Sequence, residues 1–323
     1  MKAIVRNKFG TPGVLSLQEV DQPPLTDDGL LVRVSATSVN PAEWYAIAGI
    51  PLVARPAFGF FKPRAKTLGV DFAGTVEAIG NHVRKFQVGD EVFGGRDGAF
   101  SEYVVVREER AVVKRPANVT VEQASSVGVA GLTALQGLRD KGQLQPGQQV
   151  LINGASGGVG TFAIQIAKAL GAEVTAVCST RNVELARSLG ADHVVDYTSD
   201  DFTRSPSRYD VLLDIAGSRS WSDCRRVLNK NATLVMIGAP TGSRLLGPLS
   251  HILRLRFAAI GSRRKVTFFV AKFNKADLQV LADLMETGKV KPVIDRSFNL
   301  TETADALRYL GEGHAQGKIV VTI

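Results

Sequence analysis

Short apolar runs separated by turn residues dominate residues 1 to about 120. Residues 30–34, 74–79 and 103–106 are alternating or continuous apolar stretches, and pairs such as Gly89-Asp90 lie between such runs. Many short strands joined by tight turns are typical of a small barrel-like domain. The proline-rich segment 50–66 is the exception. Its composition predicts a long irregular loop, a type of segment that often has a functional role.

From about residue 122 onward, strands alternate with helices. Helical structure interrupted by Gly128 and Gly131 is expected over 121–139, and further helical stretches lie between short apolar strands at 150–153, 173–178, 193–196, 211–215 and 233–237. This alternation predicts a Rossmann-type, doubly wound parallel sheet whose connections are right-handed crossovers. The expected fold class is therefore α/β, with a β-rich domain beside the parallel sheet.

The pattern changes again after residue 260. A strand over 266–270 and an amphipathic helix over 275–287 precede a helix near 303–310 and a last strand over 318–323. That last strand most simply returns to the first domain. We therefore expect a β-rich domain over 1–121 and 272–323, and a parallel-sheet domain over 122–271.

A glycine-rich turn joins the strand 150–153 to a helix that ends at Gly171. An ordinary tight turn would also contain glycine, and the spacing departs from G-x-G-x-x-G. The flanking strand and helix nevertheless favour a pyrophosphate site, because glycines let the backbone approach the ligand and the helix N-terminus offers N–H groups. The cofactor-binding candidates in this turn are Gly154, Ala155, Ser156, Gly157, Gly158, Val159 and Gly160.

Polar residues after the second strand of this domain indicate which dinucleotide binds. An NAD site would place an acid there, but this chain has Ser179, Thr180 and Arg181. Hydroxyls and a guanidinium can donate to a 2′-phosphate, which an acid would repel. We therefore expect NADPH and not NADH, although Arg181 could also be a solvated residue at a helix start.

Residues after other strands complete the expected cofactor site. Tyr197 could stack on the cofactor or donate to it, or could simply be a turn residue. Small residues after later strands would leave room for the ribose and nicotinamide, and Thr133 near a helix start could contact the nicotinamide amide. The small residues are Gly217, Gly238 and Ala239.

Composition and charge narrow the class of protein. Apolar residues make up 45% of the chain and charged residues 22%, as in ordinary globular enzymes. No apolar run is long enough for a membrane span, and the N-terminus carries charges where a signal peptide needs apolar residues. With two cysteines and no disulfide framework, we expect a cytoplasmic protein. The net charge of +8 is concentrated in residues 51–66 and 241–265, which contain basic but no acidic residues.

At family level the chain resembles the zinc-free quinone oxidoreductase branch of the medium-chain dehydrogenase/reductase superfamily. The matching pieces run through nearly the whole chain, at 32–41, 69–74, 88–94, 131–134, 153–160 and 313–318. The resemblance implies a GroES-like catalytic domain, a Rossmann domain, an active site in the cleft between them and a homodimer. We count Lys318, at the end of the last piece, among the cofactor-binding candidates.

Zinc-dependent members of the superfamily differ at the positions that would hold the metal. Where they have a Cys after the strand that spans 34–39 here, this chain has Asn40, and Gly69-Val70-Asp71 replaces their Gly-His-Glu segment. Their four-cysteine lobe is missing, and the four histidines form no ligand cluster, so we expect no metal. A conjugated carbonyl or quinone can accept hydride without a Lewis acid, because the negative charge delocalises.

Two residues match the family's Asn-Pro-x-x-x-Tyr pattern and are the catalytic candidates. Asn40 or Tyr45 could hydrogen-bond the substrate oxygen or the cofactor, and Tyr45 could relay a proton, although solvent could deliver it instead. The alternatives are a turn-forming Asn40 and a packed Tyr45. Asp71 could be a satisfied buried carboxylate, and we do not expect it to be a catalytic acid.

Three functions remain open from the sequence. The leading one is an NADPH-dependent, metal-free reductase of quinones or α,β-unsaturated carbonyls. The basic segments motivate a second, an enoyl reductase for CoA or carrier-protein thioesters. The third is a non-catalytic NADPH-binding protein at a membrane surface or on RNA, since 245–257 mixes apolar residues with arginine. We expect no nucleic-acid partner, because aromatic and basic residues do not interleave.

Overall fold

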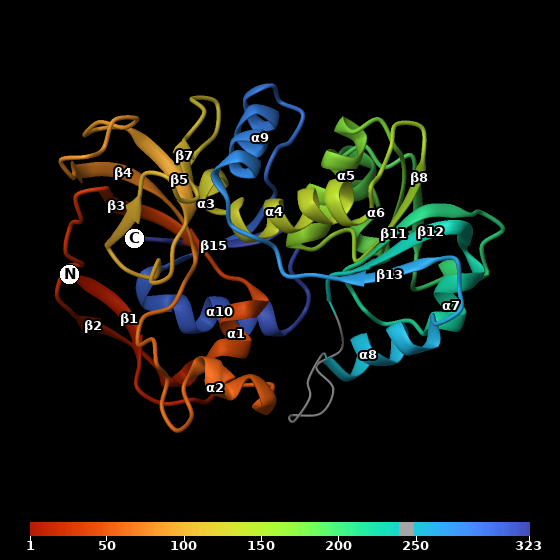
Figure 1. The fold of residues 1–323 in the computed structure, drawn as a ribbon, viewed down its shortest axis with the longest axis horizontal. Coiled ribbons are helices and arrows are strands. Elements are labelled where there is room, and N and C mark those ends of the chain that lie inside the picture. Colours follow the sequence, from red (N-terminus) through yellow and green to blue (C-terminus); the bar gives the residue numbers. More distant parts are fainter. Residues whose placement is uncertain (239–248) are drawn as a thin grey trace. The chain divides into compact units, whose positions relative to one another are not determined.

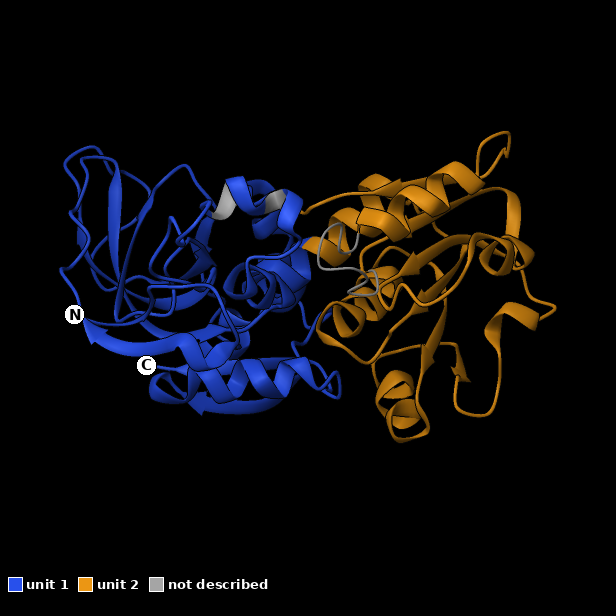
Figure 2. Ribbon diagram, turned by 90° about the horizontal axis from the view of Figure 1, so that it is seen from below, with its two compact units in different colours: residues 1–132, 272–323 blue, residues 133–271 orange. Residues whose placement is uncertain are grey.

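The computed structural model describes residues 1–238 and 249–323. Internal contacts divide the chain into two compact units, which Figure 2 shows in different colours. Unit 1 comprises residues 1–132 and 272–323, and unit 2 comprises residues 133–271. The division falls later than the expected boundary at residue 122, because helix α3 (Val121–Ser125) contacts strands of unit 1.

The main sheet of unit 1 contains seven strands in the described chain. Their order is β14-β15-β3-β4-β5-β7, and β6 pairs with β3. A separate antiparallel pair is formed by β1 (Lys2–Arg6) and β2 (Leu15–Glu19). The seven strands are β3 (Gly29–Ser38), β4 (Asp71–Ile79), β5 (Glu91–Gly95), β6 (Tyr103–Arg107), β7 (Val112–Lys114), β14 (Ile294–Asn299) and β15 (Lys318–Thr322).

The final strand joins the beginning of the chain within unit 1. β15 runs antiparallel to β3, with Val320 opposite Ser38, and parallel to β14. Apolar side chains of β15, including Ile319 and Val321, pack in one cluster with Val39 and with Leu307 of α10. The prediction that the last strand returns to the first part of the chain is therefore confirmed.

The helices of unit 1 correct one prediction from the sequence. Residues 50–66 are not wholly irregular, because a 3₁₀ turn (Leu52–Ala54) leads into the short helix α2 (Arg55–Phe58). Pro56 lies in the first turn of α2, where a missing N–H removes no intrahelical hydrogen bond. The other helices are α1 (Pro41–Ala48), α9 (Lys275–Glu286), α10 (Thr303–Gly311) and α4 (Gly128–Gln136), which continues into unit 2.

Unit 2 is a parallel sheet of six described strands in the order β10-β9-β8-β11-β12-β13. Figure 1 labels β8, β11, β12 and β13 of this sheet. The order runs outward from β8 in both directions, so right-handed crossovers place helices on both faces. This confirms the predicted doubly wound parallel sheet. The strands are β8 (Gln149–Asn153), β9 (Glu173–Cys178), β10 (His193–Asp196), β11 (Tyr209–Asp214), β12 (Leu228–Met236) and β13 (Lys265–Phe268).

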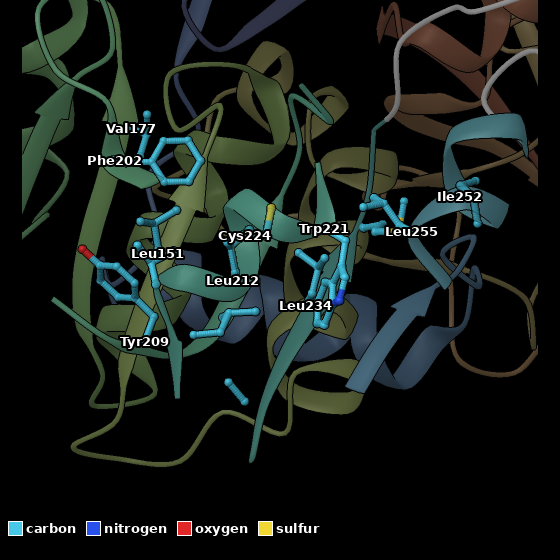
Figure 3. Close-up of a cluster of buried hydrophobic side chains, with 14 residues drawn as sticks. Leu151, Val177, Phe202, Tyr209, Leu212, Trp221, Cys224, Leu234, Ile252 and Leu255 are labelled. Atoms are coloured by element: carbon cyan, nitrogen blue, oxygen red, sulfur yellow. The ribbon is translucent and has the colours of Figure 1, made fainter. Parts of the chain in front are cut away.

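One face of this sheet is covered by α7 (Trp221–Arg226) and α8 (Leu249–Ala258). Trp221 and Cys224 from α7 and Leu255 from α8 pack with Leu212 of β11 and Leu234 of β12 (Figure 3). Helices α5 (Gly158–Ala169) and α6 (Val183–Ser188) connect β8 to β9 and β9 to β10. Along the described residues, no helix is both long and apolar enough to cross a membrane.

Candidate active site

The strand order of unit 2 creates a ligand site at one edge of its sheet. Successive strands are added on one side of β8 up to β10 and on its other side from β11 onward, and open parallel sheets bind ligands outside the carboxyl ends of the strands at such a switch point. The turn after β8, residues 154–157, therefore lies where a dinucleotide is expected, with the loop after β11 beside it. Ile215 and Ala216 of that loop donate their N–H groups to the Asn153 carbonyl, at 2.9 and 3.2 Å.

The backbone of the glycine turn requires glycine at two positions. Gly154 has φ +90°, a conformation that side chains disfavour. A Cβ at Gly160 would lie 2.3 Å from the Gly154 carbonyl oxygen, so only glycine lets α5 approach the turn this closely. Gly157 precedes the first residue of α5, and the first N–H groups of a helix have no partner inside it. These N–H groups and the positive end of the helix dipole suit a pyrophosphate.

Asp214 at the end of β11 fixes the two loops together. Its Oδ1 accepts hydrogen bonds from Asn153 Nδ2 at 2.8 Å and from the Gly217 N–H at 2.9 Å. Burial raises the pKa of this carboxyl, while the hydrogen bonds oppose the rise. Gly238, after β12, approaches the same loop closely, since a Cβ there would lie 1.9 Å from the Ile215 carbonyl oxygen. Predicted residues Gly217 and Gly238 therefore belong to one tightly packed set of loops, whereas Ala239 lies outside the described residues.

Asn182 contributes to the candidate dinucleotide site, although the sequence analysis did not identify it. Its buried amide donates to the hydroxyls of Ser156, at 2.9 Å, and Ser179, at 3.1 Å. It thereby connects the glycine turn to the segment after β9, and brings two predicted residues together. Its Oδ1 is buried without a hydrogen-bond partner among the described residues. The sequence signal that could have identified Asn182 is its place as a polar residue immediately after the Ser179–Arg181 segment.

An acid that the sequence analysis also missed approaches this segment from β10. Asp196 accepts from the Thr198 hydroxyl at 2.7 Å, and hydrogen bonds from Thr180 and Thr198 lower its pKa. The Thr180 and Thr198 hydroxyls are 2.8 Å apart. Thr180 is therefore engaged with an anionic neighbour, a contact that arises between adjacent strands and has no local signature. Arg181 and Tyr197 are both exposed beside it.

A buried polar cluster in unit 1 contains the predicted residues Asn40 and Lys318. Lys318 Nζ donates to Asn40 Oδ1 at 2.6 Å and lies 3.5 Å from Asp71 Oδ2. The same Asp71 oxygen accepts from Ser38 Oγ at 2.8 Å and Asn40 Nδ2 at 3.1 Å. Asp71 Oδ1 accepts from the Val129 N–H at 2.7 Å, near the start of α4. The cluster thus connects β3, β4, β15, α1 and α4.

Glu43 adds a second carboxyl to this cluster. It follows Asn40 in a capping box, in which Glu43 Oε2 accepts from the Asn40 backbone N–H at 2.7 Å. Burial, and then the nearby Asp71 carboxylate, raise the pKa of Glu43 to about 8. With a pKa of about 8, Glu43 is protonated at neutral pH, beside the ion pair of Lys318 and Asp71. The Asn40-x-x-Glu43 spacing was the sequence signal for this contact.

The two catalytic candidates have different surroundings. Asn40 is 2% exposed and its amide is committed to Lys318, Asp71 and Glu43, so its direct contact with a substrate remains a prediction. Tyr45, on α1, is half-buried and packs edge-on against Trp44, with ring centroids 5.9 Å apart. Burial raises the pKa of Tyr45, which makes its hydroxyl a weaker acid. In the described part of the chain this hydroxyl has no hydrogen-bond partner, so it is available to a ligand.

The residues around Lys318 do not fit a zinc site. Zinc is held by thiolate, imidazole or carboxylate ligands, and an ammonium provides no lone pair. Here Lys318 pairs with Asp71 and donates a hydrogen bond to Asn40. Asn40 and Asp71 lie in the two segments that, by the resemblance, would bear zinc ligands in zinc-dependent members of the superfamily. Within residues 1–238 and 249–323 no group of three or more His, Cys, Asp or Glu side chains could hold a metal.

The predicted residues fall into one set in each unit. Unit 1 brings together Asn40 and Lys318, with Tyr45 on the adjoining helix. Unit 2 brings together the turn 154–160 and the segment 179–181, and Thr133 is its first residue. A doubly wound sheet with a glycine turn at its switch point, in a chain with a second β-rich unit, defines a two-domain dinucleotide-binding protein of the dehydrogenase/reductase type.

Comparison with known proteins identifies the family. Residues 26–117 match the model described as the alcohol dehydrogenase GroES-like domain, and residues 189–321 match the one described as zinc-binding dehydrogenase. The chain belongs to the medium-chain dehydrogenase/reductase superfamily and groups with its quinone oxidoreductases. It is an oxidoreductase, and the predicted combination of a GroES-like domain with a Rossmann domain is confirmed.

Curated relatives align along essentially the whole chain. A mitochondrial NAD(P)H oxidoreductase of Mus musculus is 34% identical, over 100% of this chain and 89% of the relative. A chloroplastic quinone oxidoreductase of Triphysaria versicolor is 34% identical, over 99% and 98%. The 2-methylene-furan-3-one reductase of Solanum lycopersicum is 32% identical, over 99% and 79%. Two of these relatives are named as organellar, so the predicted cytoplasmic location stays a prediction.

Solved structures give the same assignment. The quinone oxidoreductase of Coxiella burnetii is 28% identical and superimposes with a TM-score of 0.85, covering 100% of this chain and 99% of that chain. Agreement over both full lengths means that both units follow the family fold.

Proposed function

We propose that the protein is an NADPH-dependent, metal-free reductase that transfers hydride to quinones or α,β-unsaturated carbonyls. The observation that carries the proposal is that the chain contains both features. Unit 2 has a glycine turn at the switch point of its sheet, and unit 1 has a buried cluster in which the Lys318 ammonium does not fit a zinc site. The relatives named as quinone oxidoreductase and furanone reductase support this substrate class. A relative named as an NAD(P)H oxidoreductase supports a nicotinamide cofactor.

The residues of unit 2 fit such a cofactor. The N–H groups at the start of α5 would hold the pyrophosphate, and Asn182 holds the Ser156 and Ser179 hydroxyls beside it. The loops after β11 and β12 provide small residues, Gly217 and Gly238, where bulk would block the ribose and nicotinamide. When bound, the cofactor supplies the hydride, and the protein supplies position and electrostatics.

The choice of NADPH depends on a balance between two side chains. Arg181 can pair with a 2′-phosphate, whereas Asp196, engaged with Thr180, would oppose it. A guanidinium can approach a phosphate in a bidentate manner, and Asp196 is already neutralised in part by hydroxyl donors. We therefore infer that the protein prefers NADPH over NADH and that Arg181 is responsible for this preference.

In unit 1, Tyr45 is the candidate for contact with the substrate oxygen. Its hydroxyl can donate to the oxygen on which negative charge develops during reduction. Its raised pKa makes Tyr45 a weaker acid, which favours solvent as the final proton donor. Asn40 and Lys318 would position α1, because both act at its N-terminus inside the buried cluster.

The resemblance also implies a homodimer, and one feature of unit 2 supports it. The outer edge of β13 has no strand partner among residues 1–238 and 249–323. Phe268, the last residue of β13, and Val270, two residues after it, are exposed, and an open edge with apolar side chains is a favourable surface for strand pairing between copies.

The test of the proposal is NADPH oxidation with a panel of quinones and conjugated ketones. We expect turnover with at least one class, and no loss of activity after treatment with a metal chelator. CoA thioesters of enoic acids form a second arm, since a salt-sensitive preference for them would instead favour enoyl reduction. Tight NADPH binding without turnover in any arm would contradict the proposal.

A substitution at Tyr45 tests its role separately. We expect Tyr45→Phe to lower kcat by a few-fold to about a hundredfold, the range for one positioned hydrogen-bonding or proton-transfer group. NADPH affinity and thermal stability should stay unchanged. An unchanged kcat would assign Tyr45 to packing alone.

A further inference from the structure

A strongly basic pocket lies at the opposite end of the unit 2 sheet from the glycine turn. Its volume is about 360 Å³, and it is formed by α7, the beginning of β12 and residues 258–264 at the end of α8 and before β13. These are the amino-terminal ends of parallel strands, whereas the dinucleotide site is at their carboxyl ends. A ligand in this pocket would therefore not occupy the cofactor position.

Four cations line the pocket, and none of its lining residues is acidic. Arg264 is fixed by two hydrogen bonds from its guanidinium to the Leu228 carbonyl oxygen, at 3.2 and 2.8 Å. The other three make no ion pair anywhere in residues 1–238 and 249–323. The remaining cations are Arg225, Lys230 and Arg263.

The acids nearest in sequence do not neutralise this charge. Asp223, on α7, is already paired with Arg226 and accepts from the Ser220 hydroxyl at 2.6 Å. From residue 249 to residue 274 the chain contains no Asp or Glu. The pocket therefore presents an uncompensated positive charge at a concave surface, which favours an anion.

Exposed apolar side chains flank the pocket on the same stretch of chain. Phe257 is 68% exposed and Ile260 is 75% exposed, and Leu253, one turn before Phe257 on α8, is 48% exposed. The opposite side of α8 is buried through Ile252 and Leu255. α8 thus has an apolar face toward the core and a second group of apolar side chains toward solvent, beside the cations.

Cations next to exposed aromatic and aliphatic side chains match the chemistry of an anionic membrane surface. The cations can meet lipid phosphates, and the apolar side chains can enter the boundary between headgroups and acyl chains. A free phosphate compound would fill the pocket but leave Phe257, which does not line it, in water. The combination therefore favours a lipid headgroup.

We propose that this surface binds the phosphate of an anionic phospholipid and attaches unit 2 to a negatively charged membrane. Arg225, Lys230, Arg263 and Arg264 hold the headgroup, while Phe257 and Ile260 insert at the interface. The binding is reversible and peripheral, and it does not depend on the reaction that the protein catalyses.

Vesicle sedimentation with the full chain tests this proposal. We expect binding to phosphatidylcholine vesicles that contain phosphatidylglycerol, no binding to phosphatidylcholine alone, and release by high salt. Arg263→Glu and Lys230→Glu should each lower vesicle affinity by about tenfold or more, since each reverses a charge at the lipid surface. Phe257→Ser and Ile260→Ser should also weaken binding. Lys289→Glu, at an exposed lysine of unit 1, is the matched control and should bind normally.

Three results would overturn the proposal. Equal losses for Lys289→Glu and Arg263→Glu would mean that net charge alone attracts the protein to vesicles. Normal vesicle binding by Phe257→Ser and Ile260→Ser, together with displacement by inorganic phosphate at physiological salt, would assign the pocket to free anions. A change of oligomeric state in Phe257→Ser, measured by light scattering, with vesicle binding unchanged, would assign this surface to contact between copies of the chain.

Discussion

Units 1 and 2 form their candidate sites from different parts of the polypeptide. In unit 1, buried charged and polar side chains from β3, β4, β15 and the start of α1 satisfy one another. In unit 2, the site consists mainly of backbone N–H groups that glycines leave accessible. Unit 1 should therefore be sensitive to the loss of a charge, and unit 2 to the addition of a methyl group.

The largest expected effect follows from removing the ammonium of the unit 1 cluster. The side chains of Lys318 and Asp71 are 4% and 0% exposed, so Lys318→Met leaves a buried carboxylate without its counter-charge. We expect the free energy of unfolding to fall by about 3–5 kcal/mol, measured by denaturant titration. Lys289→Met, at an exposed lysine, should change it by less than about 0.5 kcal/mol.

A double substitution sharpens that result. Lys318→Met combined with Asp71→Asn removes both charges but keeps hydrogen-bonding capacity at residue 71, so stability should partly recover. If the two losses simply add, the charges act independently and the cluster is not a coupled unit.

The second effect is a pH dependence of stability that belongs to unit 1. The folded-state pKa of Glu43 is raised from 4.5 to about 8, so the folded state holds this proton more tightly than the unfolded state. Stability from this group is therefore complete below about pH 4.5, decreases as the pH rises toward 8, and is constant above it. We expect a loss on the order of a few kcal/mol across that window.

Glu43→Gln isolates this contribution, because glutamine resembles the protonated acid at every pH. The stability of the natural protein relative to this variant should fall between pH 5 and pH 8. Parallel stability curves for the two proteins would show that Glu43 titrates normally and that the cluster is open to water.

The third effect concerns the glycine turn of unit 2. Gly160→Ala should destabilise the protein by about 1–3 kcal/mol, because the new Cβ would overlap the Gly154 carbonyl oxygen at 2.3 Å. Gly157→Ala is a matched control, since the nearest atom to its Cβ would be 3.8 Å away. Equal losses of stability would mean that the helix and turn can separate easily.

The smallest effect tests cofactor choice. Arg181→Asp should weaken NADPH binding by about tenfold or more, equivalent to about 1.4 kcal/mol, and NADH binding much less. Arg187→Asp, at an exposed residue of α6, should leave both dissociation constants unchanged. Equal losses of affinity for NADPH and NADH after Arg181→Asp would show that Arg181 does not contact the 2′-phosphate.

The sequence predicted local features better than distant ones. The strand, glycine turn and helix around Gly154 are consecutive, so their pattern carries the geometry. Lys318 and Asn40 are 278 residues apart, and no periodicity predicts their hydrogen bond. Asp196 likewise reaches Thr180 from the neighbouring strand, which is why the sequence suggested an acid-free segment. The short helix α2 was missed because the prolines near it obscured a helix start that tolerates Pro56.

The position of β15 between β14 and β3 has a consequence for synthesis on the ribosome. Unit 2 is one continuous stretch of chain and can complete its sheet as soon as residue 271 has emerged. The sheet of unit 1 must wait for residues 318–322, and until then Asp71 is without its cation. The second unit in the sequence is thus able to fold before the first, and the sheet of unit 1 stays incomplete until residues 318–322 have been synthesised.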